Sequence, residues 1–113
     1  MTQSEGPVVP EFVQMGLLLD FYGGLLTERQ LLACRLYFAE NLSLGEIASE
    51  LSISRQAVHD TVRRAEQALL GYESKLGLVA RFTEQQNELR HLRDMCLAGR
   101  TREVLALLEE LIT

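Results

Sequence analysis

The chain contains few residues that cross-link, break helices or perform catalysis. Its 113 residues include two cysteines, two prolines, two histidines and no tryptophan. Both prolines lie within residues 1–10, so no proline interrupts a helix beyond that point. Cys34 and Cys96 are far apart, and neither belongs to a CxxC or Cys/His motif. We therefore expect two buried, reduced thiols and no disulfide, metal ion or cofactor.

Long hydrophobic runs are missing as well. The most apolar stretch, residues 12–26, contains Gln14 and Asp20, so it is too short and too interrupted to cross a bilayer. Residues 1–10 lack the basic start of a signal peptide and are predicted to form a flexible leader. We expect a cytoplasmic protein without membrane insertion, in which residues 11–113 form a single domain.

Catalytic motifs are also absent from the sequence. It contains no HExxH or GxSxG motif and no phosphate-binding glycine loop. His59 and His91 fall on separate predicted helices, without a nearby nucleophile or carboxylate arrangement. The sequence therefore predicts a binding protein and not an enzyme.

Helix signals, in contrast, fill the chain. Capping-box patterns begin at Thr27 and Ser43, Gly77 and Gly99 are natural helix stops, and Thr101 is expected to cap the last helix. No alternating pattern of useful length predicts a strand. The fold class is all-α, with apolar residues at helical spacing over six stretches: 12–22, 27–40, 44–51, 54–76, 78–96 and 101–112.

The most informative stretch, residues 43–70, contains two helix starts separated by one short turn. Ser43 and Glu46 form an S-x-x-E capping box, and Ser54 can open the next helix. Ser52 and Ile53 leave room only for a tight turn between the two helices. Helices this close must cross steeply, which projects the second helix outward, as in a helix-turn-helix. We predict this motif over residues 43–70. The second helix is expected to continue to Leu76, because a/d spacing links the positions Val58, Val62, Ala65, Leu69, Tyr72 and Leu76, of which the first four turn inward.

The outward face of the second helix supplies the candidate nucleic-acid contacts. Arginine suits guanine and glutamine suits adenine, while further arginines can contact phosphates. Asp60 and Glu66 offset part of this charge, and the chain as a whole carries a net charge of −5, so a solvated face remains the alternative. The candidate contact residues are Arg55, Gln56, His59, Arg63 and Arg64.

The C-terminal tail, residues 78–113, carries more apolar surface than a small helix-turn-helix core requires. The excess packs either on the first two helices or on a second copy, and the frequency of two-fold dimers favours a homodimer. Gln85, on the same apolar line, is expected to set the register. The candidate dimer or core positions are Leu89, Leu92, Leu105, Leu108 and Leu111.

Two resemblances extend this interpretation. Residues 26–69 resemble the fourth region of bacterial primary sigma factors, which recognises promoter elements, through the sequence LTERQLLACRLYFAENLSLGEIASELSISRQAVHDTVRRAEQAL. With the preceding DFYGGLLT and the acidic helical tail, nearly the whole chain resembles the YlxM family of helix-turn-helix proteins. The sigma-factor pattern implies a long recognition helix with base-reading positions at Arg55, Gln56 and His59.

The YlxM resemblance implies a regulator of the signal recognition particle pathway. Members are small cytosolic bacterial proteins, typically encoded beside the GTPase subunit of that particle, so the expected partners are the GTPase subunit, the particle's RNA, or both. A sequence-specific DNA-binding transcriptional regulator is the alternative. Where sigma factors tend to carry further basic residues, this chain has Ala57, Asp60 and Glu66. This departure favours the particle over a promoter.

Overall fold

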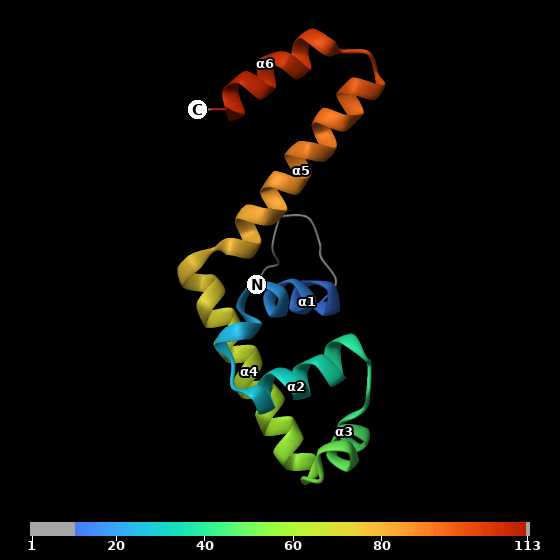
Figure 1. Cartoon of the computed structure of the whole chain (residues 1–113), viewed down its shortest axis with the longest axis vertical. Helices are drawn as coiled ribbons and strands as arrows, with labels where there is room; N and C mark the ends of the chain where they lie inside the picture. Colours follow the sequence, from blue (N-terminus) through green and yellow to red (C-terminus); the bar gives the residue numbers. More distant parts are fainter. Residues whose placement is uncertain (1–10, 113) are drawn as a thin grey trace, which may run out of the picture. The chain divides into compact units, whose positions relative to one another are not determined.

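The computed structural model describes residues 11–112, with side chains from Gln14 onward. Within this range the chain is helical and contains no strand, which confirms the all-α prediction. The predicted leader, residues 1–10, lies outside the described residues. The helices, in chain order, are α1 (Glu11–Tyr22), α2 (Glu28–Cys34), α3 (Leu44–Leu51), α4 (Arg55–Leu76), α5 (Leu78–Leu97) and α6 (Thr101–Leu111) (Figure 1).

Two helix starts, those of α2 and α3, carry the reciprocal capping box that the sequence predicts. The Thr27 hydroxyl accepts a hydrogen bond from the Gln30 backbone N–H (3.1 Å), and the Gln30 side chain accepts one from the Thr27 N–H (3.1 Å). Ser43 and Glu46 form the same reciprocal pair at the start of α3. Each cap satisfies backbone donors that the first turn of a helix leaves unpaired, which contributes about 1 kcal/mol.

The end of the second predicted helix differs from the prediction. The α-helical part stops at Cys34, and Arg35–Ala39 forms a π-helical turn, η2, although an α-helix is expected up to Glu40. Asn41 follows with a φ of 62°, in the left-handed region. The wider turn presents Phe38 to two buried clusters at once. Phe38 in this turn therefore connects the two buried clusters of the first unit.

The contacts divide the chain into two compact units, Met1–Val79 and Ala80–Thr113. The division falls beside residue 78, where the C-terminal tail is predicted to begin. That both units constitute the single domain expected over residues 11–113 stays a prediction.

In the first unit, α4 is the central helix, and α1, α2 and α3 all pack on it. The predicted inward positions Val58, Val62, Ala65 and Leu69 are all buried. Val58 and Val62 belong to the cluster shared with α3, whereas Ala65 and Leu69 belong to the one shared with α1. The seam predicted to run on to Leu76 ends earlier, because that side chain is half exposed.

A buried polar junction joins α1 to the turn between α4 and α5. The Tyr22 hydroxyl donates to Glu73 Oε1 (2.6 Å) and accepts from the Leu78 N–H (3.0 Å). The same carboxylate oxygen accepts from the Val79 N–H (3.0 Å), so one acid caps the start of α5. Burial, followed by the hydrogen bond to Glu73, raises the pKa of Tyr22. Gly77, at a φ of 64°, closes α4 as predicted.

The second unit contains most of α5 together with α6. Its core consists of Leu92, Met95 and Val104, with Leu107 packed against them. Two sequence predictions are wrong here. Arg100, and not Thr101, holds the N-cap position of α6, and no side chain caps that helix; Thr101 is already its first residue. Cys96, which is predicted to be buried, is exposed.

No helix within residues 11–112 combines the length and the apolar content that a bilayer crossing requires.

Candidate nucleic-acid interface

The turn between α3 and α4 produces the helix-turn-helix. Ser52 ends α3 in the left-handed conformation (φ 58°, ψ 44°), and the Ile53 N–H donates back to the Ala48 carbonyl (3.1 Å). Ile53 packs against the cluster formed by α2, α3 and α4, which anchors the turn. Ser54 then starts α4 by accepting from the Ala57 N–H (3.0 Å). The predicted motif is therefore present over residues 43–70.

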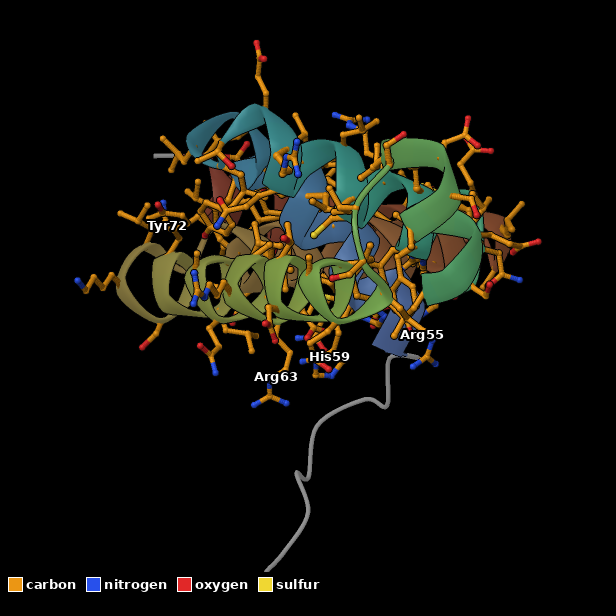
Figure 2. The ribbon with its side chains drawn as sticks, turned by 90° about the horizontal axis from the view of Figure 1, so that it is seen from below. Arg55, His59, Arg63 and Tyr72 are labelled. Carbon is orange, nitrogen blue, oxygen red and sulfur yellow. The ribbon has the colours of Figure 1, made fainter. Side chains whose placement is uncertain are left out.

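The five predicted contact residues all lie on exposed positions in the first three turns of α4: Arg55, Gln56, His59, Arg63 and Arg64. Figure 2 shows three of them, Arg55, His59 and Arg63, on the side of α4 that points away from the neighbouring helices. The structure thus brings the set together on one surface, which we name the α4 face. Contact with nucleic acid stays a prediction.

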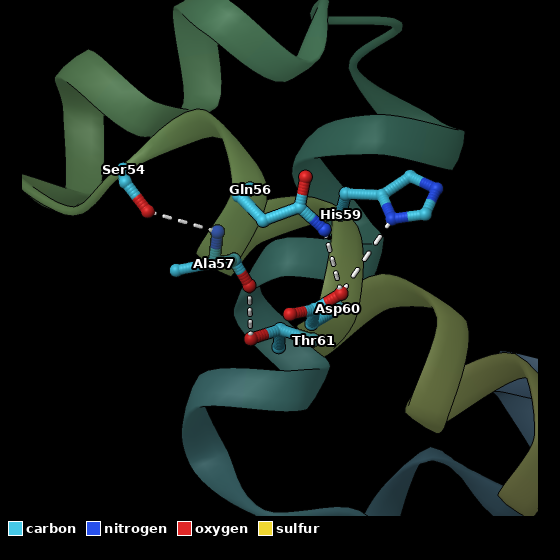
Figure 3. A network of polar contacts seen from close by, with 6 residues as sticks. All are labelled: Ser54, Gln56, Ala57, His59, Asp60 and Thr61. Carbon is cyan, nitrogen blue, oxygen red and sulfur yellow. Dashed lines mark hydrogen bonds and ion pairs between the residues drawn. The ribbon is translucent and has the colours of Figure 1, made fainter.

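A small polar network occupies part of this surface (Figure 3). The Gln56 amide donates to Asp60 Oδ1 (3.0 Å), and His59 Nδ1 lies 3.7 Å from the same oxygen. A glutamine that reads adenine needs both its amide N–H and its carbonyl oxygen. Asp60 accepts one of the two amide N–H groups, so it restricts the orientations in which Gln56 can approach a base. The sequence could not reveal this pairing, although the four-residue spacing permits it.

The acids on α4 contribute less to the α4 face than the sequence suggests. Glu66 is half-buried and lies near Cys34, where burial of the thiol and then the Glu66 charge raise the pKa of that cysteine to about 11. Glu73, on α4, is half-buried, and its carboxylate accepts a hydrogen bond from the Val79 N–H at the start of α5. Only Asp60 remains as an exposed acid on this helix. The α4 face is therefore more cationic than a count over the sequence implies.

Lys75 is a further exposed cation on α4, in its last turn, that the sequence prediction omitted. It follows Arg64 by eleven residues, or about three helical turns, so spacing alone was a usable signal. Among the described residues, no carboxylate lies within ion-pair distance of Arg55, Arg63 or Arg64. These guanidinium groups can therefore bind phosphate oxygens without first breaking an internal ion pair.

The structure separates the five apolar candidates of the tail. Leu92 is buried in the core of the second unit. Leu111 lines a groove of about 250 Å³ with Leu92 and Leu107. The four candidates that remain exposed are Leu89, Leu105, Leu108 and Leu111.

Comparison with known proteins agrees with this architecture. A model of the UPF0122 family, described as "Putative helix-turn-helix protein, YlxM / p13 like", matches residues 10–108. A UPF0122 protein of Desulforamulus reducens is 56% identical over 79 residues, which cover 70% of this chain and 68% of that protein. One from Halalkalibacterium halodurans is 44% identical over 102 residues, covering 89% and 94%. One from Thermoanaerobacter sp. is 44% identical over 105 residues, covering 89% and 90%.

The matching range includes the whole helix-turn-helix and nearly all of the second unit. The chain belongs to the UPF0122 family of YlxM/p13-like helix-turn-helix proteins.

Proposed function

We propose that this protein is a cytoplasmic regulatory binding protein, and not an enzyme, that acts in the signal recognition particle pathway. It binds the particle's RNA through the α4 face, and its acidic body faces the basic GTPase subunit. The observation that supports this most directly is the exposed cationic surface of α4, with Asp60 as its one exposed acid.

The polar network on α4 favours backbone contact over base reading. Gln56 is held by Asp60, whereas Arg63 and Arg64 lie without an internal carboxylate partner among the described residues. Arginines of this kind bind phosphates without regard to sequence. Structured RNA is recognised mainly through shape, phosphates and 2′-hydroxyl groups. A surface with free guanidinium groups and a Gln56 amide held by Asp60 therefore suits RNA better than a promoter.

The charge of the remaining chain supports a protein partner as well. The net charge is −5, so the surface away from the α4 face attracts a basic protein. This attraction weakens as salt screens exposed charges. The link to this particular ribonucleoprotein rests on the resemblance to YlxM proteins.

The second candidate function is sequence-specific DNA binding. The tight turn at Ser52 and the exposed Arg55 at the start of α4 favour it, because the first residues of a recognition helix reach base edges in the major groove. Three or four cations per protomer predict a weak interaction, since affinity for nucleic acid depends largely on the number of phosphates neutralised.

Calorimetric titration distinguishes the two functions. The purified protein is titrated with the particle's RNA, the GTPase subunit, the assembled particle and a DNA duplex, each at low and at physiological salt. We expect heat with the RNA or the GTPase subunit, and a slope of about −3 in log affinity against log salt for the RNA. No heat with the particle or its parts, together with nanomolar binding to one DNA sequence, would replace the proposal with the alternative.

A pair of matched variants tests the surface itself. Arg63→Ala with Arg64→Ala removes two cations from α4, whereas Arg29→Ala with Arg35→Ala removes two exposed cations from α2 and η2. The first pair should weaken nucleic-acid binding about tenfold or more and reduce the salt slope by about 2. The second pair should leave both unchanged. Equal effects of the two pairs would show that the α4 face is not the contact.

A further inference from the structure

α6 carries two apolar stripes, although its packing on α5 uses only one. Val104 and Leu107 pack against Leu92 and Met95 of α5. The second stripe consists of Leu105 and Leu108, one turn apart on α6, with Ile112 directly after the end of the helix, and these side chains are 56%, 37% and 70% exposed. Large apolar residues gathered on one exposed face mark an interaction surface.

α5 extends this exposed surface on the same side of the hairpin. At about 100° per residue, Leu89 and Cys96 lie about 70–90° around α5 from its buried residues. Leu105 and Leu108 lie about 70–130° around α6 from its buried residues. Because α6 turns back along α5 (Figure 1), rotations of the same sign place both groups on one side. We name this surface, Leu89, Cys96, Leu105, Leu108 and Ile112, the hairpin face.

Charged residues border the hairpin face without interrupting it. Arg93 and Arg90 lie one turn apart along its outer edge on α5, and Glu109 lies along its outer edge on α6. Arg90 donates only to the neutral Asn87 amide (3.1 Å), and Arg93 pairs with the exposed Asp94. Among the described residues, Glu109 has no ion-pair partner. The outer edge of α5 therefore carries two bases, whereas the outer edge of α6 carries one acid, Glu109, and one base, Arg102, two turns before it.

We propose that the hairpin face binds the hairpin face of a second copy of this chain, forming a two-fold four-helix dimer. A two-fold axis parallel to the helices places α5 of one protomer over α6 of the other. Arg90 and Arg93 of α5 then lie beside Glu109 of the second α6, and the symmetry makes this pairing twice. A neutral apolar centre with complementary edges on one chain fits a copy of itself. This inference does not depend on the proposed function.

Gln85 supplies a polar position on the same side of α5. It is exposed and lies one turn before Leu89, at the rim of the hairpin face. A single polar residue in a helical interface specifies register at a cost in stability. The role predicted for Gln85 from the sequence therefore has a place in this dimer.

Sedimentation velocity across a concentration series tests the interface. Wild type should associate to a dimer at micromolar concentration. Leu105→Glu with Leu108→Glu should weaken association about 100-fold or more, because two carboxylates would be buried unpaired. The matched control is Leu25→Glu with Leu32→Glu, at first-unit positions that are 59% and 46% exposed, and it should dimerise normally. A wild type that stays monomeric, or a dimer that survives the first pair, overturns the proposal.

A charge exchange and a thiol measurement complete the test. Glu109→Arg should weaken the dimer up to about tenfold, and adding Arg93→Glu should restore it, which a mere loss of folding would not do.

Cys96 should react with a thiol reagent in dilute monomer and become protected as the dimer forms. Slow reaction of Cys96 in a proven monomer would show that the rest of the chain covers the face, and would overturn the proposal.

Discussion

The two units of this protein treat apolar surface in opposite ways. In the first unit, α4 is surrounded by three helices that bury its inward residues from Val58 to Leu69, and its outer side is polar and cationic. In the second unit, two helices share a core of four residues and leave leucines on both helices in solvent. The difference teaches that a helix surrounded by three others buries most of its apolar face, whereas a helix with one neighbour, α6, leaves most of its leucines exposed.

The largest test of this comparison is truncation of one leucine in each unit. Leu69→Ala removes a fully buried side chain from the core of the first unit and should lower the free energy of unfolding by about 2–5 kcal/mol. Leu105→Ala removes an exposed side chain and should lower it by less than about 1 kcal/mol for the isolated protomer. Urea unfolding at low protein concentration measures both. Equal losses would show that the hairpin leucines belong to a core.

The polar junction around Tyr22 gives a second test of the first unit, through the free energy of unfolding. Tyr22→Phe leaves Glu73 and the Leu78 N–H without the hydroxyl and should cost about 1–3 kcal/mol. Tyr72→Phe is the control, because this neighbouring ring contacts Tyr22 and its hydroxyl makes no hydrogen bond in the described part of the chain. Chemical denaturation compares the two. If both changes cost the same, the hydroxyl of Tyr22 is not a structural link.

The two cysteines compare the units by reactivity and pH. Burial raises the pKa of Cys34 from 9.0 to about 11, so its reactive thiolate is scarce at neutral pH. In the unfolded chain this thiol ionises earlier, so the free energy of unfolding should fall by up to about 2 kcal/mol as the pH rises from about 9 to 11. Cys34→Ala should flatten that fall. At pH 7, a thiol reagent should modify Cys96 in the monomer much faster than Cys34; equal rates would contradict the burial.

The smallest expected difference concerns the helix starts. Ser54→Ala removes the cap of α4 and should cost about 1 kcal/mol, because the Ala57 N–H loses its acceptor. Thr101→Ala, at the start of α6, should change stability by less than about 0.5 kcal/mol, because no side chain caps that helix. Thermal unfolding monitored by circular dichroism suffices. A larger loss for Thr101→Ala would mean that α6 depends on a cap after all.

Much of the fold was predictable because its signals are local. Apolar spacing and the Ser43 and Ser54 caps located the helix-turn-helix, since each depends on residues within one or two turns. The π-turn at Arg35–Ala39 was not predictable in this way. Phe38 in this turn packs against two clusters that include residues as distant along the chain as Leu18 and Val62, which local spacing does not reveal.

The candidate surface on α4 was predicted in its residues but not in its electrostatics. The sequence places Arg55, Arg63 and Arg64 on an outward face, and the structure agrees. It does not reveal that Glu66 lies half-buried near Cys34, or that Asp60 binds the Gln56 amide. Both depend on neighbours that surround α4 and on rotamers chosen within that environment.

By itself, the sequence determined the helices, their starts and the residues that share each face, because helical periodicity and capping act over a few residues. Only the tertiary structure decided how much of each face is covered. Leu92 and Leu89 lie three residues apart on one predicted stripe, yet α6 covers the first and leaves the second in solvent. Periodicity specifies direction around a helix, whereas burial depends on whether a neighbouring helix occupies that direction.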